Sequence, residues 1–232
     1  MVVGVMGAMP EEIEPILARL SDVRKHEIAD NIYYTALYGS LDLVVAYSKI
    51  GKVFSSLTAS TMIEKFGVQK MLFSGVAGAI NPELKIGDLI AATKLCQHDL
   101  DITAFGHPYG YVPEGKVFVE ANPKLLEIAA QVAYKQGIVL KRGVVATGDQ
   151  FVADEARKEW IAQTFGADAL EMEGAAVAVV CDALGIPFFI LRAISDAADM
   201  DAGFDFDAFL HSSSAKSADF IFAMLDEIDQ AQ

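Results

Sequence analysis

Two acidic residues and an arginine lie where two predicted strands end. Glu173 follows a short, mostly apolar segment at residues 169–172, and Arg192 and Asp196 lie near the end of the apolar run 188–194. A continuous apolar run is typical of a strand that is buried on both faces. In open α/β sheets, ligands bind at the carboxyl ends of the strands. Carboxylates that converge there could act as general acids and bases, so this stretch predicts a site.

A structural role explains the same acids equally well. Glu173 would be favoured in the first turn of a helix, because the helix dipole places positive potential there. Asp196 would serve as a helix N-cap. This stretch by itself favours neither role over the other.

The residues between these two strands predict a helix. Residues 173–184 are rich in Ala and Val, and they are followed by Gly185-Ile186-Pro187, which is typical of a helix end. A strand, a helix and a strand of this length predict a right-handed parallel crossover.

Glu11 and Glu12 form a second acidic pair. They follow a predicted strand at residues 1–6 and a turn at residues 7–10, so they lie in the first turn of a helix. A phosphate would bind at such a helix N-terminus, but two carboxylates would repel it, and the G-x-G-x-x-G spacing is absent. The helix dipole explains Glu11, whereas Glu12 remains a candidate for chemistry.

Two further motifs carry weaker signals. Residues 74–78 (Ser-Gly-Val-Ala-Gly) predict a turn that could bring backbone N–H groups close to a ligand. The long loop at residues 98–116 begins with His98-Asp99-Leu100-Asp101, but no second histidine at helical spacing completes a metal site. We expect hydrogen bonds within this loop, and neither a metal nor a cofactor. A loop of this length in a compact domain is usually functional.

The elements that must position these residues alternate along the chain. Apolar runs predict strands at residues 1–6, 32–38, 41–48, 70–74, 88–95, 141–147, 169–172 and 188–194. Gly39-Ser40 predicts a hairpin between the second and third strands. Amphipathic or capped segments predict helices after Pro10 and at residues 55–66, 122–136, 154–165, 173–184 and 211–228. We expect one α/β domain, residues 1–232, with a mixed sheet wrapped by helices on both sides.

The composition excludes some classes of partner. The formal net charge is −14, and the isoelectric point is near 4.6. Such a surface repels phosphate backbones, so we expect no nucleic-acid binding. The charged C-terminal helix is not a membrane span. Cys96 and Cys181 both lie in apolar runs, which favours buried thiols and a reducing cytoplasm.

A set of short motifs in a fixed order carries a family resemblance. They are Gly7-Ala8-Met9 with Glu11-Glu12, Ile50-Gly51-Lys52-Val53, Ser74-Gly75 with Ala77-Gly78, Lys85-Ile86-Gly87-Asp88, residues 101–106, Thr147-Gly148-Asp149 with Phe151, Glu171-Met172-Glu173 and residues 192–196. With these motifs the chain resembles, nearly end to end, the 5′-methylthioadenosine/S-adenosylhomocysteine nucleosidases of the purine nucleoside phosphorylase-like superfamily. The resemblance implies a single α/β domain in three layers.

The resemblance also implies an activity, which is hydrolysis of the N-glycosidic bond of 5′-methylthioadenosine and S-adenosylhomocysteine. The products are adenine and a 5-substituted ribose, as in methionine salvage. Close relatives hydrolyse 5′-deoxyadenosine or aminodeoxyfutalosine. In the family pattern Asp196 gives a proton to adenine N7 with support from Ser195, Glu173 binds the ribose hydroxyls, and Glu12 deprotonates the attacking water.

Other residues acquire binding roles from the same pattern. Phe151 stacks on the purine, the Val152 backbone reads its Watson–Crick edge, and the Met172 backbone binds the ribose. Arg192 fixes Glu173. The 5′ pocket is lined by Met9, Ile50 and Phe206 and, from the partner in a homodimer, by Ile102, Phe105 and Pro113.

The acids also favour water over phosphate as the nucleophile. Phosphorylase relatives bind phosphate with arginines, one of them just after the first strand, where this chain has Pro10-Glu11-Glu12. Two departures from the family pattern stand out. Val76 replaces a common Ser or Thr, and residues 202–207 form an acidic loop that could admit a different 5′ substituent.

Overall fold

The computed structural model describes residues 1–196 and 206–231, and a mixed sheet lies at its centre. The strands are β1 (Val2–Gly7), β2 (Arg24–Ile28), β3 (Asn31–Tyr38), β4 (Leu41–Tyr47), β5 (Lys70–Ala79), β6 (Leu89–Gln97), β7 (Val119–Glu120), β8 (Leu140–Thr147), β9 (Ala169–Glu171) and β10 (Phe188–Asp196). The helices are α1 (Pro10–Leu17), α2 (Lys52–Phe66), η1 (Thr103–Phe105), α3 (Pro123–Gln136), α4 (Glu155–Phe165), α5 (Gly174–Ala183) and α6 (Phe206–Gln230).

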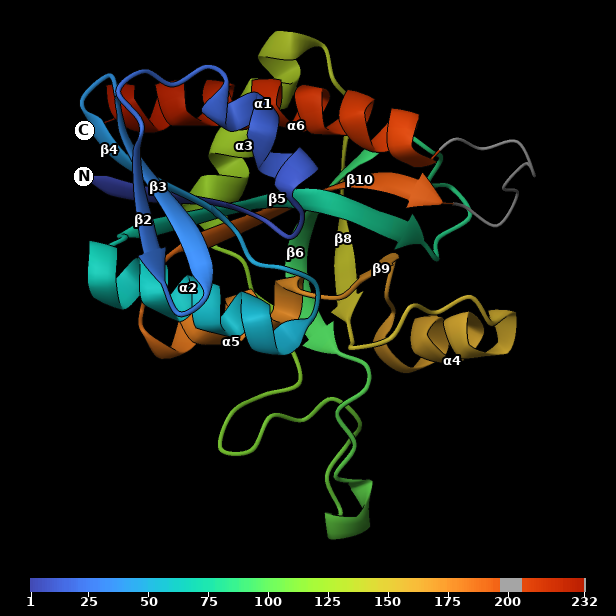
Figure 1. Ribbon diagram of the computed structural model, residues 1–232. Helices are drawn as coiled ribbons and strands as arrows, with labels where there is room; N and C mark the ends of the chain where they lie inside the picture. The colour runs from blue at the N-terminus through green and yellow to red at the C-terminus, as the bar shows by residue number, and fades with distance from the viewer. Residues whose placement is uncertain (197–205, 232) are drawn as a thin grey trace.

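Helices cover both faces of the sheet. Figure 1 shows α1, α3 and α6 on one face and α2 and α5 on the other. The central strands supply the core, where Val5, Leu72 and Ile190 are fully buried. The predicted α/β fold with a mixed sheet in three layers is therefore confirmed.

The sheet curls on itself at one side. The strand order is β10-β6-β8-β9-β5-β1-β4-β3-β2, with β7 paired to β6, and β10 also pairs with β5. Five strands therefore form a closed path, β10-β6-β8-β9-β5. The pairs β10–β6 and β9–β5 are antiparallel, whereas β10–β5, β6–β8 and β8–β9 are parallel.

The predicted parallel crossover between residues 169–172 and 188–194 is wrong. Both segments are strands, and a helix joins them, but β9 is antiparallel to β5 and β10 is parallel to it. Gly78 of β5 pairs with Leu170 on one side and with Asp196 on the other. The two strands that carry the predicted site residues, β9 and β10, therefore lie on opposite sides of β5. Apolar periodicity could not reveal which strand lies between them.

The predicted turn at residues 74–78 is also wrong, because these residues continue β5 to Ala79. Small side chains serve close packing here. A Cβ atom on Gly75 would lie 3.0 Å from both Arg192 Nη1 and Glu12 Oε1. The Val76 N–H donates to Glu12.

Other differences from the sequence-based expectations are small. The hairpin of β3 and β4 is confirmed, whereas the edge strand β2 has largely exposed, charged residues and no apolar run to signal it. Helix α6 begins at Phe206 rather than at residue 211, and Leu210, near the start of the helix, is buried. Within the described residues, none of the helices has both the length and the apolar character required to cross a membrane.

Candidate active site

A cavity of about 700 Å³ opens where β1, β5, β9 and β10 end. Its wall includes residues that follow β1, the small residues of β5, the exit of β9 and the end of β10, and it extends to Ile50 and residues 151–153. The structure thereby brings together most of the predicted site residues, namely Met9, Glu12, Ile50, Phe151, Val152, Met172, Glu173, Arg192 and Ser195.

Glu12 lies in the first turn of α1 and is buried. Its Oε2 accepts hydrogen bonds from the backbone N–H groups of Ala8 (2.5 Å) and Met9 (3.1 Å), and its Oε1 accepts one from Val76 (3.2 Å). Pro10 starts the helix without an N–H group of its own, which suits the first helical position. Burial raises the pKa of Glu12 above its usual value, although Arg192 and the three amides oppose this. A fixed carboxylate with a raised pKa is suited to accept a proton.

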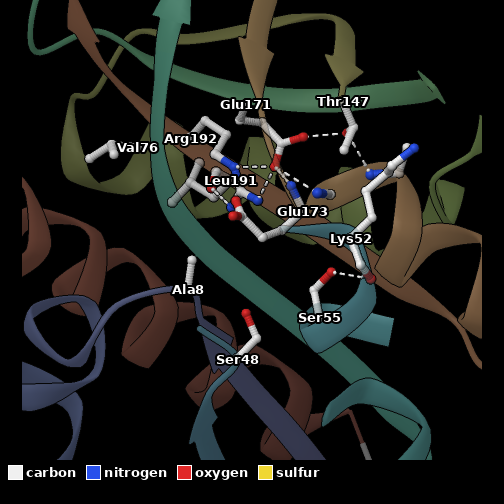
Figure 2. Close-up of polar contacts among 12 residues, drawn as sticks. Ala8, Ser48, Lys52, Ser55, Val76, Thr147, Glu171, Glu173, Leu191 and Arg192 are labelled. Atoms are coloured by element: carbon white, nitrogen blue, oxygen red, sulfur yellow. Dashed lines mark hydrogen bonds and ion pairs between the residues drawn. The ribbon is translucent and has the colours of Figure 1, made fainter. Parts of the chain in front are cut away.

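Arg192 and Glu171 form a fully buried ion pair. Arg192 Nη2 lies 2.5 Å and Nε 3.2 Å from Glu171 Oε2, and the guanidinium lies 4.1 Å from the centre of the Phe73 ring. Figure 2 shows the Glu171 carboxylate between this guanidinium and the Thr147 hydroxyl, which donates to Glu171 Oε1. Glu171 Oε2 also accepts from the backbone N–H of Gly174 at the start of α5 (2.6 Å).

This pair corrects the predicted role of Arg192, which was expected to fix Glu173. The guanidinium instead binds Glu171, a residue that the sequence analysis did not assign to the site. One signal could have identified it: Glu171 is the acid inside an otherwise apolar segment. A buried carboxylate requires a charged or hydrogen-bonding partner, and Arg192 lies on the neighbouring apolar strand.

Glu173 is the N-cap residue of α5, but its side chain makes no capping hydrogen bond. The carboxylate of Glu171 accepts from the backbone N–H groups there instead. Glu173 Oε1 accepts a hydrogen bond of 2.9 Å from the backbone N–H of Gly51, in a different part of the chain. Burial, and then the Glu171 carboxylate, raise the pKa of Glu173 to about 7, whereas Arg192 opposes both.

A family model described as the phosphorylase superfamily matches residues 2–226. The chain belongs to this superfamily.

Two relatives and one solved structure show which members of the phosphorylase superfamily this chain is similar to. The aminodeoxyfutalosine nucleosidase of Campylobacter jejuni subsp. jejuni is 56% identical over 98% of this chain and 100% of its own length. The 5′-methylthioadenosine/S-adenosylhomocysteine nucleosidase of Actinobacillus succinogenes is 34% identical over 99% of this chain and 100% of its own. A crystal structure of the Campylobacter jejuni 5′-methylthioadenosine/S-adenosylhomocysteine nucleosidase has 56% sequence identity and a TM-score of 0.96, covering 98% of this chain and 99% of that chain. The resemblance to nucleosidases that the motifs predicted is thereby confirmed.

Not every residue that the superfamily pattern predicted lies in the described part of this cavity. The backbone of Asp196 pairs with Gly78 in β10, but the side chains of Asp196 and Phe206, and the acidic loop from residue 202, lie outside the described residues. Ser195 is buried beside Asp196, with its Oγ 3.4 Å from the Ala77 carbonyl oxygen.

The three residues expected from a partner subunit lie elsewhere. Ile102, Phe105 and Pro113 belong to the segment between β6 and β7, which extends away from the sheet at the bottom of Figure 1. They do not line the described cavity of their own chain. Phe105 in η1 is 81% exposed.

Proposed function

We propose that this protein is a nucleosidase that hydrolyses the N-glycosidic bond of adenosine-type nucleosides, with 5′-methylthioadenosine and S-adenosylhomocysteine as substrates. The observation that carries the proposal is the Glu12 carboxylate, which is buried and held by three backbone amides in the wall of a cavity that Glu173 also lines. The names of the relatives support the same activity.

The chemistry explains why carboxylates are needed. Breaking the bond leaves positive charge on the ribose and negative charge on the base. Glu12 takes a proton from the attacking water, Glu173 holds the ribose hydroxyls, and Asp196 supplies a proton at adenine N7. Each general acid or base is worth about 100- to 10,000-fold in rate.

The charges around the cavity favour water over phosphate. Among the described lining residues, Arg192 and Lys158 are the cations, and each has a carboxylate partner. Glu12 and Glu173 line the same wall and add negative charge to it when they are ionised. A phosphate would therefore meet carboxylates and no unpaired cation in this part of the cavity, which disfavours phosphorolysis.

The 5′ substituent is the part of the substrate that separates the candidates. Aminodeoxyfutalosine, 5′-deoxyadenosine, 5′-methylthioadenosine and S-adenosylhomocysteine share adenine and ribose and differ at the 5′ position. The relative with 56% identity is named for aminodeoxyfutalosine and the one with 34% for 5′-methylthioadenosine and S-adenosylhomocysteine. We therefore include aminodeoxyfutalosine among the proposed substrates. Met9 and Ile50 line the cavity, and we assign them to the 5′ pocket.

We further propose that the enzyme is a cytoplasmic homodimer that acts in methionine salvage. Helix α2 exposes apolar side chains beside the cavity, with Val53 75% exposed and Phe54 and Leu57 less so. These side chains, and separately the exposed Phe105 of η1, are apolar surface that a second copy would bury. Ile102, Phe105 and Pro113 would then complete the 5′ pocket of the neighbour.

The activity is tested by adenine release from 5′-methylthioadenosine in phosphate-free buffer. We expect turnover without phosphate, and a loss of about 100-fold or more in Glu12→Gln, because the amide cannot accept the proton. Glu14→Gln, an exposed change on the same helix, is the matched control and should keep wild-type activity. Turnover that requires added phosphate and yields a ribose 1-phosphate would contradict the proposal.

A further inference from the structure

Three segments at the edge of the cavity are joined by a closed set of hydrogen bonds. Lys52 Nζ donates to Asp99 Oδ1 (2.7 Å), the Asp149 N–H donates to Asp99 Oδ2 (2.8 Å), and the Lys52 N–H donates to Asp149 Oδ1 (2.7 Å). Lys52 starts α2, Asp99 follows β6 and Asp149 follows β8. We call this arrangement the Lys52–Asp99–Asp149 ring. The mechanism proposed above uses none of its members.

The ring is packed closely enough to resist distortion. The side chains of Lys52 and Asp99 are only 19% and 14% exposed, so their attraction is weakly screened by water. Gly51 has φ +99°, and a Cβ atom there would lie 3.0 Å from Asp149 Oδ1. A Cβ atom on Gly148 would lie 2.4 Å from the His98 ring. The glycines of the two motifs therefore allow the three segments to approach each other.

The ring adjoins the backbone donor of Glu173, the carboxylate that is proposed to bind ribose. The Gly51 N–H donates to Glu173 Oε1, and the next N–H along the chain, that of Lys52, is held by Asp149. Ile50, on the other side of Gly51, and Phe151, two residues after Asp149, both line the cavity. The ring therefore sets the position of one donor to Glu173 and the separation of two walls.

We propose that Asp99 is a positioning residue that acts through the Lys52–Asp99–Asp149 ring to hold the Gly51 amide on Glu173. The role in turnover rests on the nucleosidase activity proposed above. Asp99 does not line the cavity; it receives both a side-chain cation and a backbone amide, one on each carboxylate oxygen.

Asp99→Asn is the direct test. The amide retains one acceptor oxygen, so its NH2 group must face either Lys52 or the Asp149 N–H, and the ring opens. We expect kcat/KM for 5′-methylthioadenosine to fall by about 10- to 100-fold, which is typical of a small misplacement of a reacting group. Lys52→Met should give a similar loss, and Lys52→Arg, which keeps the charge, should restore much of it. Asp182→Asn, in the exposed Lys116–Asp182 ion pair, is the matched control and should have no effect.

Two readouts separate positioning from a general structural effect. In a Glu173→Gln background, Asp99→Asn should cause little further loss of kcat/KM, because the group that it positions is already impaired. A crystal structure of Asp99→Asn, or of Lys52→Met if that variant is the more stable, should show the Gly51 nitrogen beyond 3.5 Å from the residue 173 carboxylate. Full additivity in the double variant, or a Gly51–Glu173 hydrogen bond kept at its present length, would overturn the proposal. An inactive wild-type enzyme would instead overturn the nucleosidase assignment, and the crystal structure would still decide the role of the ring.

Discussion

At the scale of single residues, the site is a group of carboxylates that folding removes from water. Glu12, Glu171 and Glu173 are all buried, while Arg192 supplies a buried positive charge among them. Glu171 takes the direct contact with Arg192. Glu173 is left with one backbone donor and a raised pKa. Keeping the ionised Glu173 carboxylate buried beside the cavity lowers the free energy of unfolding.

The cost predicts how stability depends on pH. The pKa of Glu173 is about 7 in the folded protein against a usual 4.5, so the folded state holds a proton that the unfolded state loses as the pH rises between these values. Its contribution to stability is therefore fully present below pH 4.5 and is lost as the pH rises through 7, by about 3 kcal/mol at most. We expect Glu173→Gln to melt at a higher temperature than wild type at pH 8 and at nearly the same temperature at pH 4, as measured by calorimetry. An equal difference at both pH values would show that the substitution acts through packing rather than ionisation.

The sequence identified the residue types at the site better than their contacts. Glu12, Glu173 and Arg192 were predicted because charges at strand ends are conspicuous in apolar surroundings. The partner of Arg192 was predicted wrongly, because Glu171 and Glu173 are two residues apart and both are acidic. Which of them faces the arginine depends on how β9 pairs with its neighbours, and no local pattern contains that information.

At the scale of elements, β9, α5 and β10 form one unit that is fastened by the Glu171–Arg192 pair. Glu171 Oε2 binds the guanidinium from β10 and the first N–H groups of α5, while its Oε1 receives the Thr147 hydroxyl from β8. The sequence predicted the positions of these elements because their apolar runs and their Gly and Pro boundaries are local signals. It did not predict that β5 separates β9 from β10, because strand pairing is decided by long-range packing.

Loss of the Glu171 charge should therefore loosen this unit. Glu171→Gln leaves Arg192, which is 1% exposed, without its ion-pair partner. We expect the free energy of unfolding in urea to fall by about 3 kcal/mol, since breaking a buried pair leaves an uncompensated charge. Breaking the exposed Lys116–Asp182 pair with Asp182→Asn should cost about 0–1 kcal/mol. If the two variants lost equal stability, the buried pair would have no special structural role.

At the scale of the whole molecule, one chain supplies a cavity and, on a separate projection, the residues expected to close a second one. The segment between β6 and β7 is secured at its base, where the rings of Tyr109 and Trp160 contact each other edge to face. Its η1 helix carries the exposed Phe105 away from the body. In the proposed dimer this projection would reach the neighbouring cavity, and no local sequence pattern encodes a contact between two copies.

The proposed dimer makes Phe105 a test of assembly. Phe105→Ala should raise KM for 5′-methylthioadenosine by about 10-fold, because the 5′ pocket of the neighbour loses an apolar contact worth about 1–2 kcal/mol. Thermal stability of the protomer should change little, since the side chain is exposed in the single chain. Light scattering should give twice the mass of one chain for the wild type. A wild-type monomer with full activity would contradict the dimer.

The closed path of strands has a consequence for how nucleosides reach the cavity. Gly78 of β5 lines the cavity and pairs with β9 on one side and with β10 on the other, so this part of the wall is held by main-chain pairing in both directions. Moving Gly78 outward to widen the cavity would therefore disturb both pairings at once. Ile50 and Phe151 line the same cavity and are 57% and 82% exposed, so we expect nucleosides to enter and leave past these two residues.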